Sequence, residues 1–205
     1  MHENHTERKV LCISGKDIKN FLQDLISNDI TKADKGLMYA ALLGPNGKFL
    51  FDFFLFSKDN CFFLDCHTVA AEALCQRLLL YRLRKDVTIT STDLSVSCGI
   101  KNNPKDAVLD PRHPGMGWRH YGKRLDVEHV DWTALRIKLG IPMFEKELLS
   151  SSYILEMRFE QLNGVDFKKG CYIGQENTAR MKLKDKLRRR LLPMYSKEKL
   201  NLGQE

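Results

Sequence analysis

Short apolar segments separated by turn residues dominate the first third of the chain. The segments 10–13, 37–43, 48–56 and 61–65 are rich in aliphatic and aromatic residues and predict strands. Turn residues such as those of 44–47, Gly-Pro-Asn-Gly, separate them. Nearly every position of the last three segments is apolar. We therefore expect at least part of this meander to be covered on both faces.

A second pattern, with apolar residues three and four positions apart, predicts helices. Ile18, Phe21, Leu22, Leu25 and Ile26 share one helical face, and Ser14 with Asp17 resembles a capping box before it. Further helices are expected at 67–84, at 128–139 before a terminating glycine, and at 174–184. Strands are expected at 87–90, 94–100 and 107–109, an ordered loop at 110–122, and 153–163 stays ambiguous. Antiparallel strands mixed with helices favour an α+β fold.

The composition is that of a globular protein. The chain has 205 residues, of which 43% are hydrophobic and 29% charged, enough for a substantial core in one or two domains. No stretch approaches the roughly 18 apolar residues of a membrane span, so no membrane partner is expected. Residues 1–5 resemble neither a secretion signal nor a mitochondrial import segment, which leads us to expect a cytoplasmic, bacterial protein.

Cysteine and histidine spacing gives no metal motif. The six cysteines form no C-x-x-C pair, and a core of this size without a signal peptide favours reduced thiols. The six histidines are scattered, with His2 and His5 close to the terminus. We therefore predict neither disulfides nor a metal site.

Positive charge is concentrated late in the chain. The net charge is +7, and between Lys168 and Arg190 nine Lys or Arg residues stand against two acids. Such a stretch suits nucleic-acid phosphates, an anionic ligand such as a polyglutamylated folate, or simply a solvated face. No nucleic-acid motif accompanies it, so nucleic acid is not our expected partner.

The most informative motif is Lys169-Gly170-Cys171-Tyr172-Ile173-Gly174-Gln175-Glu176, with Arg180 four residues further on. It places a thiol between two glycines, beside lysines and before a predicted helix. These surroundings favour the thiolate, the reactive form of cysteine. The alternative is that Cys171 is a small buried hydrophobic residue, as many free cysteines are.

This motif resembles the signature of the YgfZ family, folate-binding relatives of the glycine-cleavage T-protein (aminomethyltransferase) that act in iron–sulfur protein assembly and repair. The resemblance runs from about Lys9 to the chain end. Other matching segments, in chain order, are 13–17, 21–23, 27–30, 43–48, 81–84, 110–112, 140–142 and Glu156 ahead of 164–165.

The resemblance implies a T-protein-like folate-binding fold of ferredoxin-like α/β units around a central cleft. Residues 1–190 would form this folate-binding region, which allows two interleaved α/β subdomains. Family members continue into a C-terminal β-barrel, for which few residues remain here. Residues 191–205 would then be a truncated start of the barrel or a tail.

The resemblance also implies roles for individual residues. Glu156 would recognise the pterin of tetrahydrofolate, Trp132 would flank the ligand, and Asp52 would position the reacting centre. Each has a plainer alternative, respectively a solvated glutamate, a core anchor of a helix and a solvent-facing acid on an edge strand.

The signature itself would supply the remaining site residues. Cys171 would be the reactive group, a soft ligand and redox-active nucleophile. One cysteine cannot hold an iron–sulfur cluster, which normally takes four thiolates. The other residues expected to line or brace the folate site are Lys169, Gly170, Tyr172, Gly174, Gln175, Glu176 and Arg180, with a short-range ion pair between the last two.

Together these features predict a tetrahydrofolate-binding accessory factor for the assembly or repair of iron–sulfur proteins. Its partners would be folate and iron–sulfur client or assembly proteins. The alternative is a folate-dependent aminomethyl transferase, favoured by Asp52 and Glu156. A basic nucleic-acid-binding module is a third interpretation.

Overall fold

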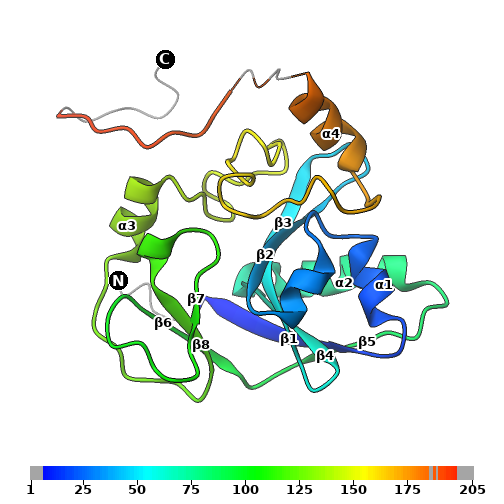
Figure 1. Ribbon diagram of the computed structural model, residues 1–205, viewed down its shortest axis with the longest axis horizontal. Coiled ribbons are helices and arrows are strands. Elements are labelled where there is room, and N and C mark those ends of the chain that lie inside the picture. Colours follow the sequence, from blue (N-terminus) through cyan, green and yellow to red (C-terminus); the bar gives the residue numbers. More distant parts are fainter. Residues whose placement is uncertain (1–6, 185–186, 188, 198–205) are drawn as a thin grey trace.

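Two antiparallel sheets organise the chain in the computed structural model, which describes residues 7–184, 187 and 189–197 (Figure 1). The larger sheet has the strand order β2-β3-β4-β1-β5 and the smaller one β6-β8-β7. The strands are β1 (Arg8–Ser14), β2 (Met38–Leu43), β3 (Phe49–Lys58), β4 (Cys61–His67), β5 (Thr88–Ser91), β6 (Ser95–Gly99), β7 (Val108–Leu109) and β8 (Trp118–Gly122).

Four α-helices and three short 3₁₀ helices accompany these strands within the described residues. The α-helices are α1 (Ile18–Gln23), α2 (Ala71–Arg82), α3 (Trp132–Leu139) and α4 (Gln175–Leu183). The 3₁₀ helices are η1 (Ile30–Asp34), η2 (Thr68–Ala70) and η3 (Pro114–Met116). The fold is therefore mixed α+β, as predicted. None of the described helices is both long and apolar enough to cross a membrane.

Both faces of the larger sheet are buried, which confirms the expectation from the continuous apolar pattern. Along β2, Met38, Ala40 and Leu42 belong to one core, and Tyr39 and Ala41 to the other. Successive side chains of a strand point to opposite faces, so a strand buried on both sides needs apolar residues throughout. The first core packs against α1, η1 and α2, and the second against residues 141–172.

The start of α1 differs from the predicted capping box. Asp17 is the N-cap but makes no side-chain capping bond. Its Oδ2 instead accepts a hydrogen bond from Asp86 N at 2.7 Å. Gly15, at φ +121°, allows the Asp86 carbonyl to approach where a side chain would collide. A contact between distant segments therefore replaces the local cap.

The stretch 110–122, predicted as an ordered loop, contains η3 and the whole of β8. β8 pairs with β6 from Ser95–Gly122 to Gly99–Trp118, and with β7. Its sequence, Trp-Arg-His-Tyr-Gly, lacks the apolar alternation by which a strand is recognised. The buried position of Arg119 is occupied by a charged residue, which polar partners hold in place.

The helix predicted at 128–139 agrees more closely with the structure. α3 begins at Trp132, later than expected, because Asp131 caps it by accepting from Ala134 N at 2.9 Å. Gly140 ends it in the left-handed conformation, at φ 65°. Residues 191–197 have no helix or strand, and the rest of the predicted barrel start or tail, 198–205, lies outside the described residues.

Candidate functional site

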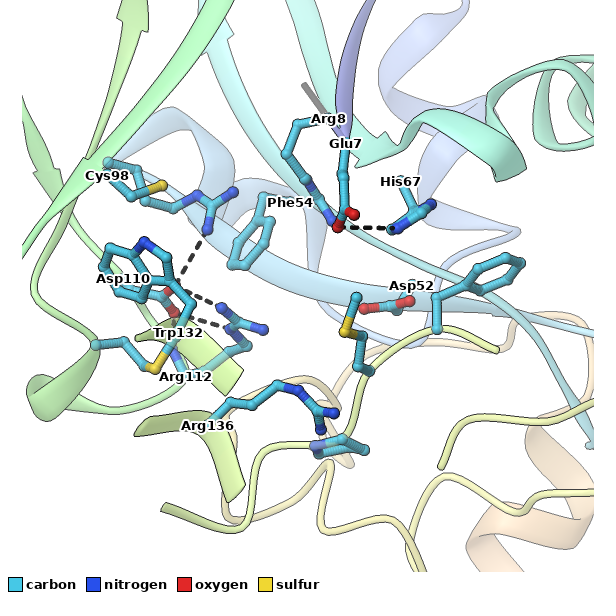
Figure 2. A pocket seen from close by; sticks show the side chains of 15 residues that line it. Glu7, Arg8, Asp52, Phe54, His67, Cys98, Asp110, Arg112, Trp132 and Arg136 are labelled. Carbon is cyan, nitrogen blue, oxygen red and sulfur yellow. Dashed lines mark hydrogen bonds and ion pairs between the residues drawn. The ribbon is translucent and has the colours of Figure 1, made fainter. Parts of the chain in front are cut away.

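A cavity of about 150 Å³ lies against the second face of the larger sheet (Figure 2). Its lining combines aromatic and thioether side chains with four arginines and three acids. Two of the sequence-predicted site residues, Asp52 and Trp132, line it. They come from β3 and α3, which are far apart in sequence, so the fold brings this pair together.

Strand register places the polar residues of the cavity floor. Arg8 on β1 is paired with His67 on β4, and Asp52 and Phe54 follow each other on the same face of β3. His67 Nε2 lies 3.6 Å from Glu7 Oε2. Polar side chains from three adjacent strands therefore point into one space.

Asp52 is 8% exposed and is the carboxylate of this floor. Its Oδ2 accepts a hydrogen bond from the Tyr39 hydroxyl at 2.9 Å. Burial raises the pKa of Tyr39 well above its ordinary value, and the nearby Asp52 carboxylate adds to this effect. Tyr39 therefore stays a protonated donor that fixes the orientation of Asp52.

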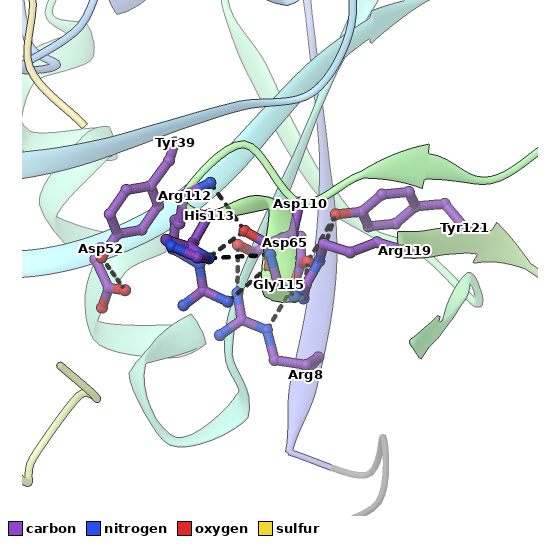
Figure 3. Close-up of polar contacts among 10 residues, drawn as sticks. All are labelled: Arg8, Tyr39, Asp52, Asp65, Asp110, Arg112, His113, Gly115, Arg119 and Tyr121. Atoms are coloured by element: carbon purple, nitrogen blue, oxygen red, sulfur yellow. Dashed lines mark hydrogen bonds and ion pairs between the residues drawn. The ribbon is translucent and has the colours of Figure 1, made fainter. Parts of the chain in front are cut away.

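A buried ion cluster forms the side of the cavity (Figure 3). Asp65 has 0% exposure and accepts from Arg8 Nε at 2.7 Å, from Arg119 Nη2 at 2.8 Å and from the Tyr121 hydroxyl at 2.9 Å. The second carboxylate, Asp110, accepts from Arg112 Nη2 at 2.8 Å. Arg119 Nη1 reaches Asp110 Oδ2 at 3.4 Å, so the guanidinium joins the two carboxylates.

The cluster keeps its charges in spite of burial. Burial alone would raise the pKa of the Asp65 carboxyl, but Arg8 and Arg119 outweigh it and hold this pKa below its ordinary value. Arg112 and Arg119 lower the pKa of Asp110 against burial in the same way. Paired, hydrogen-bonded charges are the form in which buried ions are tolerated.

Phe54 lies within this arginine cluster. The guanidinium carbons of Arg119, Arg112 and Arg8 lie 4.1, 4.7 and 5.5 Å from its ring centroid. Cation–π attraction therefore complements the ion pairs and fixes the ring that forms part of the cavity wall.

The opposite wall comes from α3 and the loop after it. Trp132 and Arg136 on α3 and Phe144 in the loop line the cavity, and Arg136 Nη1 donates to Glu147 Oε2 at 2.9 Å. The Nε atom of Arg136 and the Nδ1 atom of His67 are buried without a hydrogen-bond partner in the described residues. Buried polar atoms are rarely left unpaired, so two of them beside one cavity indicate a place for a polar ligand.

The signature loop lies elsewhere, against α1 and the β2–β3 turn. Lys169 Nζ donates to the carbonyls of Gln23, Ile26 and Asn28 at 2.7, 2.6 and 3.1 Å. Burial lowers the pKa of Lys169 to about 8, while Asp29 and Asp166 oppose this shift. The amine thus satisfies the carbonyls around the end of α1 and anchors the loop to it.

The residues after Cys171 are anchored as well. Tyr172 is buried in the second core, its N–H donates to Gln175 Oε1 at 3.1 Å, and burial raises its pKa to about 12. Ile173 N donates to the Asp24 carbonyl at 3.2 Å. Cys171 itself is exposed. The loop therefore holds a thiol in solvent between two fixed neighbours.

The two glycines of the signature have different roles. Gly174 is at φ +81°, and a side chain there would collide with the Gly44 carbonyl and Leu43. Asn177 Nδ2 donates to the Asn46 carbonyl at 2.7 Å, across the same contact. Gly170 has open space around it and no positive φ, so the described structure does not require a glycine there.

The remaining sequence-predicted residues do not line the cavity. Cys171 and Glu156 are absent from its lining, and the Glu156 carbonyl accepts from Leu191 N at 2.9 Å. Arg180 donates to Asn177 Oδ1 at 2.6 Å. The predicted ion pair between Arg180 and Glu176 does not form among the described residues, and the Glu176 side chain is exposed. The expected folate-binding roles of Glu156 and of the signature residues stay predictions.

Sequence reasoning missed most of the polar groups at the cavity. Arg8, Asp65, His67 and Arg119 are polar residues within strands, and Arg136 lies on a helix. One signal was present for Asp110 and Arg112, because Asp-Pro-Arg was among the segments that carry the family resemblance. An acid inside an apolar strand, as at Asp65 in Phe-Leu-Asp-Cys, was a second signal.

The curated proteins similar to this chain include proteins named as iron–sulfur cluster assembly factors. The chain is 30% identical over 91% of its length to "Iron-sulfur cluster assembly factor IBA57 homolog, mitochondrial" of Mycosarcoma maydis, of which it covers 55%. It is 31% identical, again over 91% of its length, to the human "Iron-sulfur cluster assembly factor IBA57, mitochondrial", of which it covers 64%. The chain thus spans roughly half to two thirds of the length of these relatives.

Two further comparisons are less informative. No family model matches the chain. A solved aminomethyltransferase T of the glycine cleavage system from Bartonella henselae superposes with a TM-score of 0.42 and 17% identity, over 45% of this chain and 26% of that one. This likeness is too limited to assign a function.

The comparisons correct the expected location. Both relatives are mitochondrial proteins of eukaryotes, so the prediction of a cytoplasmic protein is wrong by this finding, and bacterial origin is not supported. The amino-terminal residues 1–5, on which that prediction was based, lie outside the described residues. The resemblance to the YgfZ family stays a prediction.

The ion cluster gives a first testable prediction. Asp65→Asn removes a buried charge that two arginines share, and breaking such a pair is expected to cost about 3–5 kcal/mol of unfolding free energy. Because the folded-state pKa of Asp65 lies below its ordinary value, this stabilisation is present above about pH 4 and is lost as the pH falls below it. Urea unfolding of the wild-type protein and of Asp65→Asn between pH 3 and 7 measures how the difference in unfolding free energy changes with pH.

The matched control is Asp34→Asn, whose partner Lys19 is exposed, and it should change stability by less than about 1 kcal/mol. Equal unfolding free energies for Asp65→Asn and Asp34→Asn would contradict the stabilising role of the cluster.

The anchored loop gives a second prediction. Lys169→Met leaves three carbonyls without their donor and should destabilise the fold by about 2–3 kcal/mol, measured by urea unfolding. Lys168→Met, at the exposed neighbouring position, is the control and should leave stability nearly unchanged. If both variants unfold at the wild-type midpoint, Lys169 does not anchor the loop.

Proposed function

We propose that this protein acts in iron–sulfur cluster assembly, binds a tetrahydrofolate in the cavity beside Asp52 and Trp132, and presents Cys171 as its reactive group. The observation that carries the proposal is the similarity over 91% of the chain to proteins named iron–sulfur cluster assembly factors. The lining of the cavity supports ligand binding, and the exposed thiol of the anchored loop supports the reactive role of Cys171.

The cavity residues fit a flat, polar-edged ligand. Trp132, Phe54 and Phe144 provide aromatic surface, and Asp52 provides an acceptor for adjacent N–H donors. His67 Nδ1 and Arg136 Nε, which have no hydrogen-bond partner among the described residues, would provide further polar contacts. At about 150 Å³ the cavity is below the roughly 300–1,000 Å³ of typical ligand sites, so it would hold a ring system and leave the remainder of the ligand outside.

When bound, tetrahydrofolate would supply a carrier for one-carbon groups. The residues of this chain would bind and orient it. Tyr39 holds Asp52 in position at 2.9 Å, and the arginine cluster fixes Phe54. In this arrangement Asp52, rather than Glu156, would be the carboxylate that recognises the ligand.

Cys171 would act at the surface rather than inside the cavity. Its thiol is exposed, whereas the other five cysteines are buried or half-buried. The flanking bonds of Lys169 and Ile173 limit the motion of the loop. A fixed, accessible thiol suits transient binding of cluster iron or exchange with a client thiol, with the remaining ligands supplied by partner proteins.

One observation favours an aminomethyl transferase as the second candidate. Asp52 is buried and lines the cavity, where it would position a reacting centre. The formation of methylene-tetrahydrofolate from an aminomethylated carrier protein would support that activity.

Ligand binding can be measured with the two tryptophans. Trp132 lines the cavity, whereas Trp118 is buried and donates to the Lys101 carbonyl at 2.8 Å. Tetrahydrofolate should quench the fluorescence, and Trp132→Phe should remove most of this quenching. Asp52→Asn keeps an acceptor for Tyr39 but loses the charge, so it should weaken binding by about tenfold or more.

Glu156→Gln is the matched control for ligand binding and should leave the affinity nearly unchanged. The opposite result, with Glu156→Gln weakening binding and Asp52→Asn not, would place the ligand outside this cavity. The absence of saturable quenching would contradict folate binding altogether.

The thiol can be tested separately. Cys171→Ala should abolish the recovery of iron–sulfur enzyme activity in cells that lack their own assembly factor, while its tetrahydrofolate titration stays as in wild type. Cys75→Ala removes a half-buried thiol and should recover the activity fully. Recovery by Cys171→Ala equal to that of wild type would rule out the thiol role.

A further inference from the structure

Two cysteines meet where β1 pairs with β4, which lie side by side in the larger sheet (Figure 1). Cys12 on β1 is opposite Phe63 on β4. Cys61 is two residues before Phe63, so its side chain projects from the same face of the sheet. A side-chain hydrogen bond links the thiols of Cys12 and Cys61. The sequence shows no metal motif here, because only the strand pairing brings these two residues together.

The pair is accessible and lies away from the cavity. Arg8 and His67, which line the cavity, are opposite each other at one end of the β1–β4 pairing, and the two cysteines are at its other end. Both thiols are half-buried, so part of each side chain is open to solvent. A dissolved ion can therefore reach them without entering the cavity.

The charge state of the pair depends on its surroundings. Burial raises the pKa of the Cys12 thiol, and the neighbouring Cys61 thiol adds to this effect. The Thr90 side chain, opposite Cys12 on β5, opposes it with a hydrogen bond. Two adjacent thiolates repel each other, so the pair keeps its protons until a cation replaces them. A cation between the sulfurs removes this repulsion.

The register favours a bridging ion over a disulfide. Cys12 and Cys61 are diagonal neighbours across two antiparallel strands, and such positions lie about 7–8 Å apart. A disulfide needs Cα atoms within roughly 6.8 Å and a sulfur–sulfur bond of about 2.05 Å. A metal ion that forms two bonds of about 2.3 Å spans a wider gap between the sulfurs. The strands therefore need not shift to bind it.

The number of ligands selects the ion. Within the part of the chain that the structure describes, no group of three or more His, Cys, Asp or Glu side chains could hold a metal ion. Structural zinc takes four protein ligands, and an iron–sulfur cluster normally takes four thiolates. Soft thiolates select Cu(I), which is stable with two sulfur ligands alone. Two thiols without a third ligand therefore suit Cu(I).

A basic residue beside the pair matches the charge of such a complex. One Cu(I) ion with two thiolates carries a net charge of minus one. Lys58 on β3 is opposite Cys61, so the two side chains project from the same face. Its ammonium group is exposed beside the site. The acid next in sequence, Asp59, lies in the turn beyond this pairing.

We propose that Cys12 and Cys61 bind a single Cu(I) ion between their two sulfur atoms. Each thiol releases one proton and forms one copper–sulfur bond. The copper stays Cu(I), so no electron is transferred and no oxidant is needed. The site requires neither the folate nor the Cys171 thiol of the proposed function.

A competition with a coloured chelator tests this binding. The reduced full chain is mixed without oxygen with the Cu(I) complex of bicinchoninate, whose colour reports the copper that the chelator retains. The wild-type protein should withdraw one Cu(I) per chain. Cys12→Ser and Cys61→Ser should each weaken binding by about a hundredfold or more, because loss of a ligand exceeds the roughly 10–100-fold effect of outer-shell changes. Cys75→Ser, which removes a half-buried thiol packed against the first core, is the matched control and should bind as wild type.

Alkylation of the wild-type protein tests the site without any variant. One equivalent of Cu(I) should protect Cys12 and Cys61 from N-ethylmaleimide and leave Cys171 labelled, as read by peptide mass spectrometry. One equivalent of Zn(II) should protect neither member of the pair, because two ligands do not complete its coordination. Cys171→Ser should show the same protection by Cu(I) as wild type.

Three results would overturn the inference. The first is that the wild-type protein withdraws no copper, or that both Cys12→Ser and Cys61→Ser withdraw as much as wild type. The second is protection of Cys171 in place of the pair, which would assign copper to the signature loop. The third is equal protection by Zn(II), which would require further ligands. The tetrahydrofolate titration, measured separately, reports on the proposed function.

Discussion

The buried carboxylate of Asp65 is the interaction on which the arrangement of the two sheets depends. It lies on β4 of the larger sheet and receives Arg8 from β1 and Arg119 and Tyr121 from β8 of the smaller sheet. Removing its charge from water is costly, and only several well-placed donors offset that cost. The geometry of these donors therefore fixes where the smaller sheet stands, and with it one side of the cavity.

This constraint explains which features the sequence could predict. Continuous apolar runs identified β2, β3 and β4 and their burial on both faces, because periodicity reports how a strand is covered. It does not report pairing between distant charges. Asp65 is 57 residues from Arg8 and 54 from Arg119, and no local pattern links them. β8 was missed for the same reason, since its buried arginine looks like a surface residue until its partners are known.

The candidate site was predictable in part. Family resemblance gave Asp52 and Trp132, and the fold brings both to one cavity, but it also grouped the whole signature with the ligand. In the structure Lys169, Tyr172 and Gly174 hold the loop against α1 and the β2–β3 turn. Much of the length of this motif therefore reflects the contacts that keep one exposed thiol in place. A linear motif does not separate residues that support a site from those that act in it.

One short segment connects the thiol loop with the turn that follows α2. The Asp24 carbonyl accepts from Ile173, two residues after Cys171, and the Asp24 carboxylate pairs with Lys85 at the turn that presents Leu83. Lys169 binds the Gln23 carbonyl next to it. Because all three contacts converge on the end of α1, the turn at Leu83 and the loop that carries Cys171 are held by the same piece of backbone.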